Sequence, residues 1–188
     1  MDKFFGNLHA VLAVGFALAI GLMLSPLAAS MPTPPATSVF QWLHVFFGIT
    51  WIGLLYYFNF VQIPTMPSIP AELKPGVSKF IAPKALFFFR WAAAFTVLTG
   101  LILAWLYDEL HEAMALKEGF QLIGIGMWLA VIMAANVWFV IWPNQKKALG
   151  IVQADDAAKA KAAKMAMMAS RFNTMLSIPM LLCMVAFR

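Results

Sequence analysis

Five apolar runs, each about long enough to cross a lipid bilayer, constrain this chain more than any other feature of its sequence. They lie at about 8–29, 39–62, 86–107, 121–142 and 169–187. A helix needs roughly 20 consecutive apolar residues to cross the hydrocarbon core of a bilayer. The pattern therefore predicts an all-α integral membrane protein, a bundle of five transmembrane helices that forms one membrane domain over residues 1–188.

The composition agrees with a membrane protein and argues against several other classes. Apolar residues make up 63% of the chain and charged residues only 11%, whereas a soluble domain keeps about a quarter of its residues charged. The net charge of +5 does not indicate nucleic-acid binding, because the basic residues lie in short connectors and not in one patch. Cys183 is the only cysteine, which excludes an internal disulfide, a CxxCH haem attachment and a cysteine zinc site.

The charges of the connectors predict the orientation of the chain in the membrane. Cytoplasmic connectors carry an excess of lysine and arginine, and two of the four connectors, 63–85 and 143–168, are rich in lysine. The other two are uncharged (30–38) or acidic (108–120). We therefore expect the N-terminus in the cytoplasm and the C-terminus on the outer, periplasmic side.

Two segments have a further interpretation. The first apolar run also resembles a signal peptide, because Lys3 precedes it and Ala28-Ala29-Ser30 resembles a cleavage site. The segment of about 152–168 begins with acids and ends with bases, which matches a helix dipole. We expect it to form a cytoplasmic helical extension, continuous with the fifth span up to a bend near Pro179. The run from Trp138 to Lys147 predicts a helix stop at Pro143.

His44 is the only histidine well inside a predicted span, and imidazole is the usual axial ligand of a membrane haem. Gly48 and Trp51 follow it on one helix face at spacings of four and three residues. We therefore predict a cofactor site made by His44, Gly48 and Trp51, with the iron of haem b bound to His44. The alternative is a histidine that hydrogen-bonds a neighbouring helix. In either case the imidazole should face the bundle interior, because a polar ring in hydrocarbon lacks partners.

A second ligand for such a haem is harder to find in the sequence. His9 should lie roughly 20 Å below His44, judged from the helix rise. His111 in the acidic outer connector could fold over His44 as a weaker candidate metal ligand, although a solvated loop histidine is the simpler interpretation. The thioethers of Met23 and Met184 could also reach it. A bis-histidine site within the bundle is not supported, and no catalytic residue is identifiable.

Four of the other polar residues within the predicted spans need an explanation. Arg90 and Arg171 lie at cytoplasmic edges, where the snorkelling of a long basic side chain explains them. Asn59 and Asn136 lie towards inner ends, where each either holds helices together or belongs to a polar site.

Several motifs together carry a family resemblance. They are Trp42-Leu43-His44 with Gly48, Trp51-Ile52-Gly53, Tyr57 to Val61, Pro64, Arg90-Trp91, Asn136-Val137-Trp138, Ile141 to Gln145, Arg171, Asn173-Thr174, Ser177 and Pro179. With these motifs the chain resembles the membrane domain of the bacterial urate oxidase PuuD family. The resemblance implies a multi-pass protein of the bacterial inner membrane. In that family a periplasmic cytochrome c domain follows, which fits the outer C-terminus expected here.

The stretch from Trp42 to Gly53 also resembles, more distantly, the CopD-like and HemJ-like membrane proteins. The HemJ-like proteins bind haem b, which strengthens His44 as a haem ligand. Urate-oxidising members carry a histidine before Asn-Thr in the last helix and another soon after it. This chain has Phe172 at the first position and ends at Arg188, and it contains no cytochrome c domain. We therefore expect electrons to leave through a separate cytochrome c.

Two hypotheses for the function follow. The first is a membrane-embedded redox subunit that bears haem and passes electrons to a cytochrome. The alternative is a non-catalytic accessory or structural subunit of a larger respiratory or photosynthetic membrane complex. Both imply the lipid bilayer and other membrane subunits as partners and exclude nucleic acid. A transporter is the least favoured class, because no broken helix or inverted repeat is evident. Whether the chain is an enzyme stays open at this point.

Overall fold

The computed structural model describes residues 2–30 and 33–187. All secondary structure in these residues is helical, with no strand among them. The chain divides into two compact units, Met1–Val39 and Phe40–Arg188, which are described separately.

The first unit contains α1 (Asp2–Phe5), α2 (Leu8–Leu24), the 3-10 helix η1 (Pro26–Ser30) and the beginning of α3 (Pro35–Tyr56). Asn7 starts α2 because its Oδ1 accepts hydrogen bonds from the backbone N–H groups of His9 and Ala10, at 3.1 and 3.3 Å. At the other end, the Ser25 hydroxyl donates to the Leu22 carbonyl at 2.7 Å. The helix predicted over 8–29 is therefore 17 residues long and ends at Leu24.

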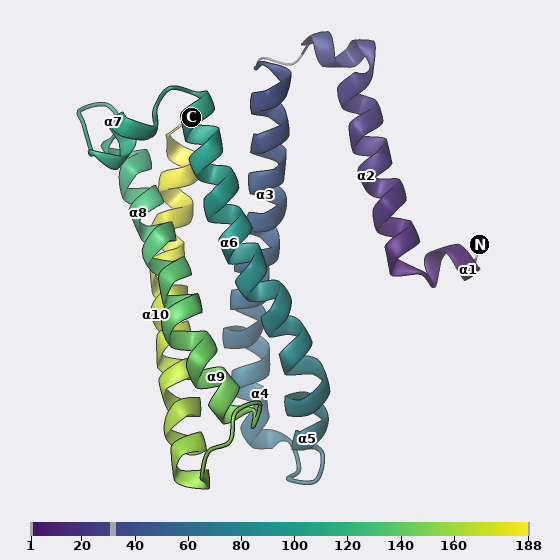
Figure 1. The fold of residues 1–188 in the computed structure, drawn as a ribbon, viewed down its shortest axis with the longest axis vertical. Helices are drawn as coiled ribbons and strands as arrows, with labels where there is room; N and C mark the ends of the chain where they lie inside the picture. The colour runs from purple at the N-terminus through teal and green to yellow at the C-terminus, as the bar shows by residue number, and fades with distance from the viewer. Residues whose placement is uncertain (1, 31–32, 188) are drawn as a thin grey trace. The chain divides into compact units, whose positions relative to one another are not determined.

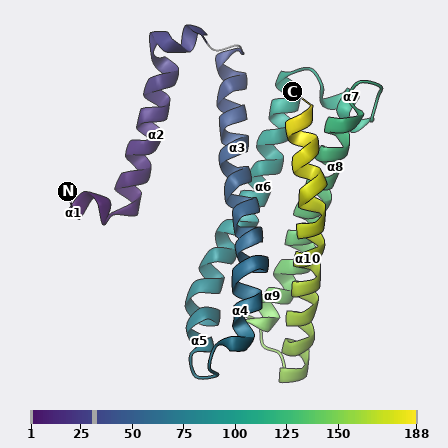
Figure 2. The same ribbon diagram turned by 180° about the vertical axis from the view of Figure 1, so that it is seen from behind.

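The second unit is a bundle in which α3, α6, α8 and α10 run side by side (Figures 1 and 2). We call the end of the bundle that carries α4, α5 and α9 the lysine-rich end, and the end that carries α7 the acidic end. After α3 the elements are η2 (Tyr57–Gln62), α4 (Ile63–Thr65), η3 (Met66–Ser68), α5 (Lys74–Gly76), η4 (Val77–Ile81), α6 (Ala82–Leu106), α7 (Leu110–Met114), α8 (Gln121–Asn136), η5 (Val137–Ile141), α9 (Trp142–Ala148) and α10 (Asp156–Ala186).

Four continuous helical runs among the described residues are long and apolar enough to cross a membrane. They are Pro35–Ser68, Lys74–Leu106, Gln121–Ala148 and Asp156–Ala186. This confirms the all-α membrane class, and the runs contain the last four predicted spans. The first predicted span corresponds to the shorter apolar helix α2. The count of five spans and the orientation of the termini therefore stay predictions.

Three of these runs contain a π-helical segment that ends two residues before a proline. The segments η2, η4 and η5 precede Pro64, Pro83 and Pro143 respectively. A proline lacks the N–H for the bond to the carbonyl four residues earlier, and its ring clashes with that carbonyl. A wider π turn removes this conflict without ending the helix. The predicted stop at Pro143 is therefore wrong, because the helix continues through α9 to Ala148.

The helix α10 runs without interruption over 31 residues, with Pro179 inside it. Asp155 caps its start, since its Oδ1 accepts a hydrogen bond from the backbone N–H of Ala158 at 2.7 Å. The predicted continuous helix is confirmed, with its beginning at Asp156 and not at about 152.

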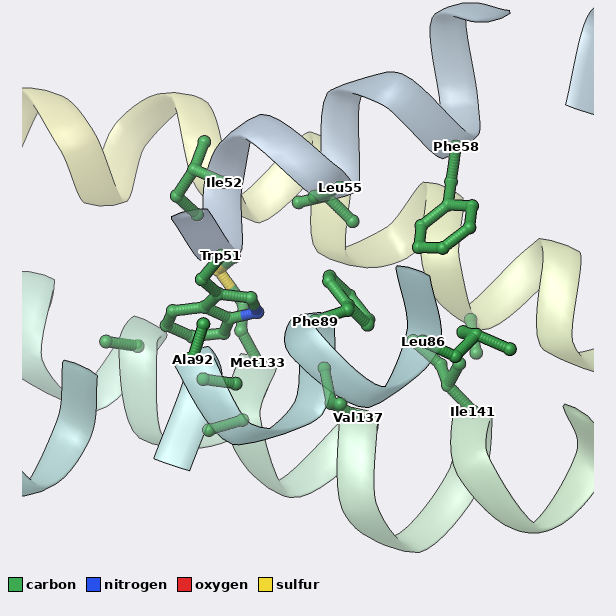
Figure 3. Packing of buried hydrophobic residues seen from close by; sticks show 14 of the residues in the cluster. Trp51, Ile52, Leu55, Phe58, Leu86, Phe89, Ala92, Met133, Val137 and Ile141 are labelled. Carbon is green, nitrogen blue, oxygen red and sulfur yellow. The ribbon is translucent and has the colours of Figure 1, made fainter. Parts of the chain in front are cut away.

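The core of the bundle lies where α3, α6, α8 and η5 meet (Figure 3). Its largest fully buried apolar side chains are Trp51, Leu55, Phe89, Met133 and Val137. The side chains that face outward are also apolar, which in a membrane places them against lipid.

Small residues let α8 and α10 pack closely. Gly126, Ala130 and Ala134 on α8 are buried, and so are Ala166, Ala169 and Cys183 on α10, the helix that packs against it. A Cβ atom added to Gly126 would lie 2.8 Å from the Cβ of Cys183. These small residues of α8 thus form a helix-packing surface.

Candidate functional site

The imidazole of His44 is held against α6 by one hydrogen bond. Its Nδ1 lies 2.9 Å from the backbone oxygen of Thr96. A carbonyl oxygen only accepts hydrogen bonds, so Nδ1 carries the proton and donates it. In the neutral ring Nε2 then keeps its lone pair, which is the state in which histidine binds a metal while its other nitrogen is oriented by a carbonyl.

The ring of His44 rests on Gly100 of α6. A Cβ atom at position 100 would lie 2.7 Å from Cε1 and 2.9 Å from Nδ1 of the imidazole. Real Cβ atoms do not approach this closely, and both of these atoms belong to the imidazole ring. Only glycine therefore allows the imidazole to reach the Thr96 carbonyl at this point.

Two cavities of the second unit meet at His44. The first, which we call the Gly100 cavity, has a volume of about 160 Å³ and is lined among others by Gln41, His44, Gly100, Tyr107 and Met184. The second, the Trp51 cavity, has about 340 Å³ and is lined among others by His44, Gly48, Trp51, Met180 and Met184. His44, Thr96, Ala130 and Met184 line both cavities. The three residues predicted as a cofactor site thus share one cavity wall.

Trp51 has an unusual polar environment. Its side chain is completely buried within the core cluster (Figure 3), and its indole N–H has no hydrogen-bond partner among the residues that the structure describes. A buried donor without an acceptor costs about 1–3 kcal/mol. Gly48 is less constrained, because a Cβ atom there would meet only the Thr96 methyl at 3.9 Å.

The other candidate ligands are placed differently. His111 is exposed in α7 and is not among the residues that line either cavity. His9 and Met23 lie in α2, in the first unit. Among the described residues, no group of three or more histidine, cysteine or acidic side chains could hold a metal ion. Of the two methionines considered in the sequence, Met184 lines both cavities with His44, while Met127 and Met180 each line one of them.

A layer of polar side chains joins the helices below the cavities, on the side of the lysine-rich end. The Asn136 amide donates to the Ala169 carbonyl at 2.9 Å and to Asn173 Oδ1 at 2.7 Å. Asn173, which is completely buried, donates to the Met133 carbonyl at 3.0 Å. Asn59 donates to the Ser170 hydroxyl at 2.7 Å. Of the two interpretations open for Asn59 and Asn136, these bonds support helix association.

Tryptophan N–H groups also join elements. Trp128 donates to the Met114 carbonyl at 3.1 Å, and Trp138 donates to the Arg90 carbonyl at 3.1 Å. Sequence reasoning could not pair these residues, because each bond links segments that are distant or separated by a turn.

This geometry defines the class of the molecule as a bundle of membrane helices with a histidine at two partly open cavities. The family model described as urate oxidase N-terminal matches residues 104–187, from the end of α6 through α10. The match confirms the resemblance to the urate oxidase membrane domain, and the chain therefore carries a membrane region related to it. No curated protein and no solved structure matches the chain. The matched residues include the polar layer on α8 and α10 and Met184, while His44 lies outside them.

Proposed function

We propose that this chain is a membrane-embedded redox subunit that holds haem b through His44 and passes electrons to a separate cytochrome c. The observation that carries the proposal is the hydrogen bond from His44 Nδ1 to the Thr96 carbonyl. It fixes the ring orientation and leaves Nε2 available at the meeting point of two cavities.

The donor set around His44 suits haem. A nitrogen ligand from His44 and a thioether from Met184 are both ligand types that haem iron accepts. His44, Thr96, Ala130 and Met184 line both cavities, and these residues would hold the macrocycle. When bound, haem supplies one-electron transfer.

The residues of the chain would each contribute a defined part. His44 would hold the iron, and the Thr96 carbonyl would keep its imidazole in one orientation and raise its basicity. Gly100 would leave room for the ring. Gly48 and Trp51 would line the pocket, and the free indole N–H would donate to a polar group of the bound molecule. The apolar walls would exclude water, which helps to set the redox potential.

The position of His44 supports electron exchange on the periplasmic side. His44 lies in the first third of the helical run Pro35–Ser68, on the side of the acidic end. Lysines gather at the opposite end of the bundle, which the positive-inside rule places in the cytoplasm. With α2 as an additional span, the N-terminus lies in the cytoplasm, the C-terminus lies in the periplasm of a bacterial inner membrane, and the haem lies within the outer half.

The visible absorption spectrum of the purified protein tests this proposal. We expect a Soret band that shifts on reduction and is lost in His44→Ala. His111→Ala is the matched control, because His111 is exposed and lies away from both cavities, and it should keep the band. A protein that stays colourless after expression with added haem would refute the proposal.

A second candidate is a non-catalytic accessory subunit of a larger respiratory or photosynthetic membrane complex. The polar layer favours it, because the amides of Asn136 and Asn173 are used to join α8 and α10 and not to form an open site. Purification in a mild detergent separates the two candidates. Stable co-purification with other membrane subunits, without a haem spectrum, would favour the accessory role.

A further inference from the structure

Arg90 of α6 lies in an aromatic cradle at the lysine-rich end of the bundle. Its guanidinium carbon is 3.7 Å from the ring centroid of Trp142, the first residue of α9. Phe87 and Trp138 lie at 5.7 and 6.0 Å from the same carbon. The Trp138 indole also donates to the Arg90 carbonyl, which ties η5 to the backbone that carries the guanidinium. Arginine stacks on such rings through cation–π attraction.

A second cation approaches the same indole. Lys146 lies one helical turn after Trp142, and its ammonium nitrogen is 5.7 Å from the Trp142 ring centroid. Two like charges near one ring repel each other, most strongly in a low-dielectric setting. The ion pairs among the described residues are Lys117–Glu112 and Lys159–Asp156, and neither involves Arg90 or Lys146. The two positive charges therefore lack a protein counter-ion in the part of the chain that the structure describes.

The guanidinium of Arg90 also has one covered nitrogen. Its Nη1 is shielded from solvent and has no acceptor among the described residues. Snorkelling, the simplest reading of an arginine near a membrane edge, places the charged group in water. It does not account for a guanidinium nitrogen that is covered and unpaired. An anion at this position would satisfy both the charge and the donors.

We propose that Arg90 and Lys146, held at the Trp142 indole, bind the phosphate group of an anionic phospholipid. The planar fork of a guanidinium matches a phosphate bidentately, and a nearby ammonium adds a point charge. Basic pockets between helices at the cytoplasmic side of membranes bind anionic headgroups in this way.

The surface around the two cations favours a lipid over soluble phosphate. Phe88 and Trp91 on α6 are 48% and 41% exposed, and Phe139 on η5 is 79% exposed. These side chains lie on the elements that carry Arg90 and precede Trp142, and they offer an apolar surface for acyl chains. The acyl chains of a lipid whose headgroup is bound at the Trp142 indole would thus have an apolar protein surface to lie against.

Native mass spectrometry of the full chain in detergent tests the site, with phosphatidylglycerol as the anionic probe and phosphatidylcholine as the zwitterionic one. We expect phosphatidylglycerol to bind in preference to phosphatidylcholine. Arg90→Gln and Lys146→Gln should each weaken phosphatidylglycerol binding by about fivefold, the effect of one basic residue near an anionic headgroup. Lys164→Gln is the matched control, because it removes one exposed charge from the same end on α10, and it should bind as the unaltered protein does.

Three outcomes would overturn the proposal. If Lys164→Gln weakened phosphatidylglycerol binding as much as the other two variants, the loss would depend on net charge and not on this site. Equal binding of both lipids would leave Arg90 as a snorkelling residue. Displacement of the lipid by inorganic phosphate at the same concentration would assign the site to a soluble anion. If Arg90→Gln does not fold, Lys146→Gln and Arg90→Lys still test the site. Arg90→Lys keeps the charge but loses the planar fork, so it should bind phosphatidylglycerol less tightly than the unaltered protein.

Discussion

The α-carbon of Gly100 lies against the imidazole ring of His44, and a methyl group there would approach Cε1 to 2.7 Å. This contact joins α3 to α6 and sets where the histidine can lie. The position of the His44 imidazole therefore depends on Gly100, a residue without a side chain.

Gly100→Ala should therefore displace the His44 ring from the Thr96 carbonyl. We expect a loss of about 1–3 kcal/mol in the free energy of unfolding, typical of an overpacked contact, and loss of any spectrum that depends on His44. Thermal unfolding in detergent and the absorption spectrum measure the two effects. Gly48→Ala is the control, because its added Cβ would meet only the Thr96 methyl, at 3.9 Å. Equal effects of the two variants would contradict the close contact at Gly100.

Asn173→Ala should loosen the packing of α10 on α8. The change removes the acceptor of the Asn136 amide and the donor to the Met133 carbonyl, both across the helix pair. Interhelical hydrogen bonds in membranes contribute roughly 0.6 kcal/mol each, so we expect a loss of about 1–2 kcal/mol in the free energy of unfolding. Asn144→Ala is the matched control, because the Asn144 amide bonds only the Val140 carbonyl of its own helical run. A loss of the same size in Asn144→Ala would show that the interhelical bonds are not responsible.

The membrane class and the long helices could be predicted from the sequence because the bilayer imposes a length and an apolar composition on each span. The residues at which the helices end could not be predicted in this way. Pro143 carries a strong local signal to stop, yet η5 accommodates it, because the neighbouring α10 packs along η5 and α9. Such a choice depends on tertiary contacts that no local pattern contains.

The candidate site was predictable in part. His44 stands out in the sequence as a histidine inside a span, and Gly48 and Trp51 share its helix face. Gly100 lies 56 positions further along the chain, and only the structure brings it under the ring. The pairing of Arg90 with Trp142 is also a contact between distant segments. Contacts of this kind depend on how two helices are rotated against each other, which periodicity alone does not determine.

Cysteine labelling should place the lysine-rich end in the cytoplasm. In a Cys183→Ala background, Lys159→Cys should react with a membrane-impermeant maleimide only after the cells are opened, because Lys159 lies in the 143–168 connector, which is rich in lysine. Glu118→Cys, at the acidic end, should react in intact cells. The reverse labelling pattern would invert the proposed topology and move His44 to the cytoplasmic half.

Trp51→Phe separates a structural role of the indole from a role in binding. The indole N–H is buried without an acceptor, so its removal leaves no partner unsatisfied, and the phenyl ring still fills most of the core position. We therefore expect the free energy of unfolding to change by less than about 1.5 kcal/mol, because removal of the unpaired donor offsets part of the cost of the cavity that the smaller ring leaves.

Binding should respond differently to the same change. If a bound molecule accepts a hydrogen bond from this N–H, Trp51→Phe should lower its affinity by about tenfold, the effect of one lost bond of about 1.4 kcal/mol. A haem titration followed by absorption measures the affinity, and thermal unfolding of the protein before haem is added measures the stability. Trp128→Phe is the control, because its N–H already donates to the Met114 carbonyl and the residue lines neither cavity. That control should lose stability and keep haem affinity. If Trp51→Phe instead lost stability and kept its haem affinity, the unpaired indole of Trp51 would serve packing alone.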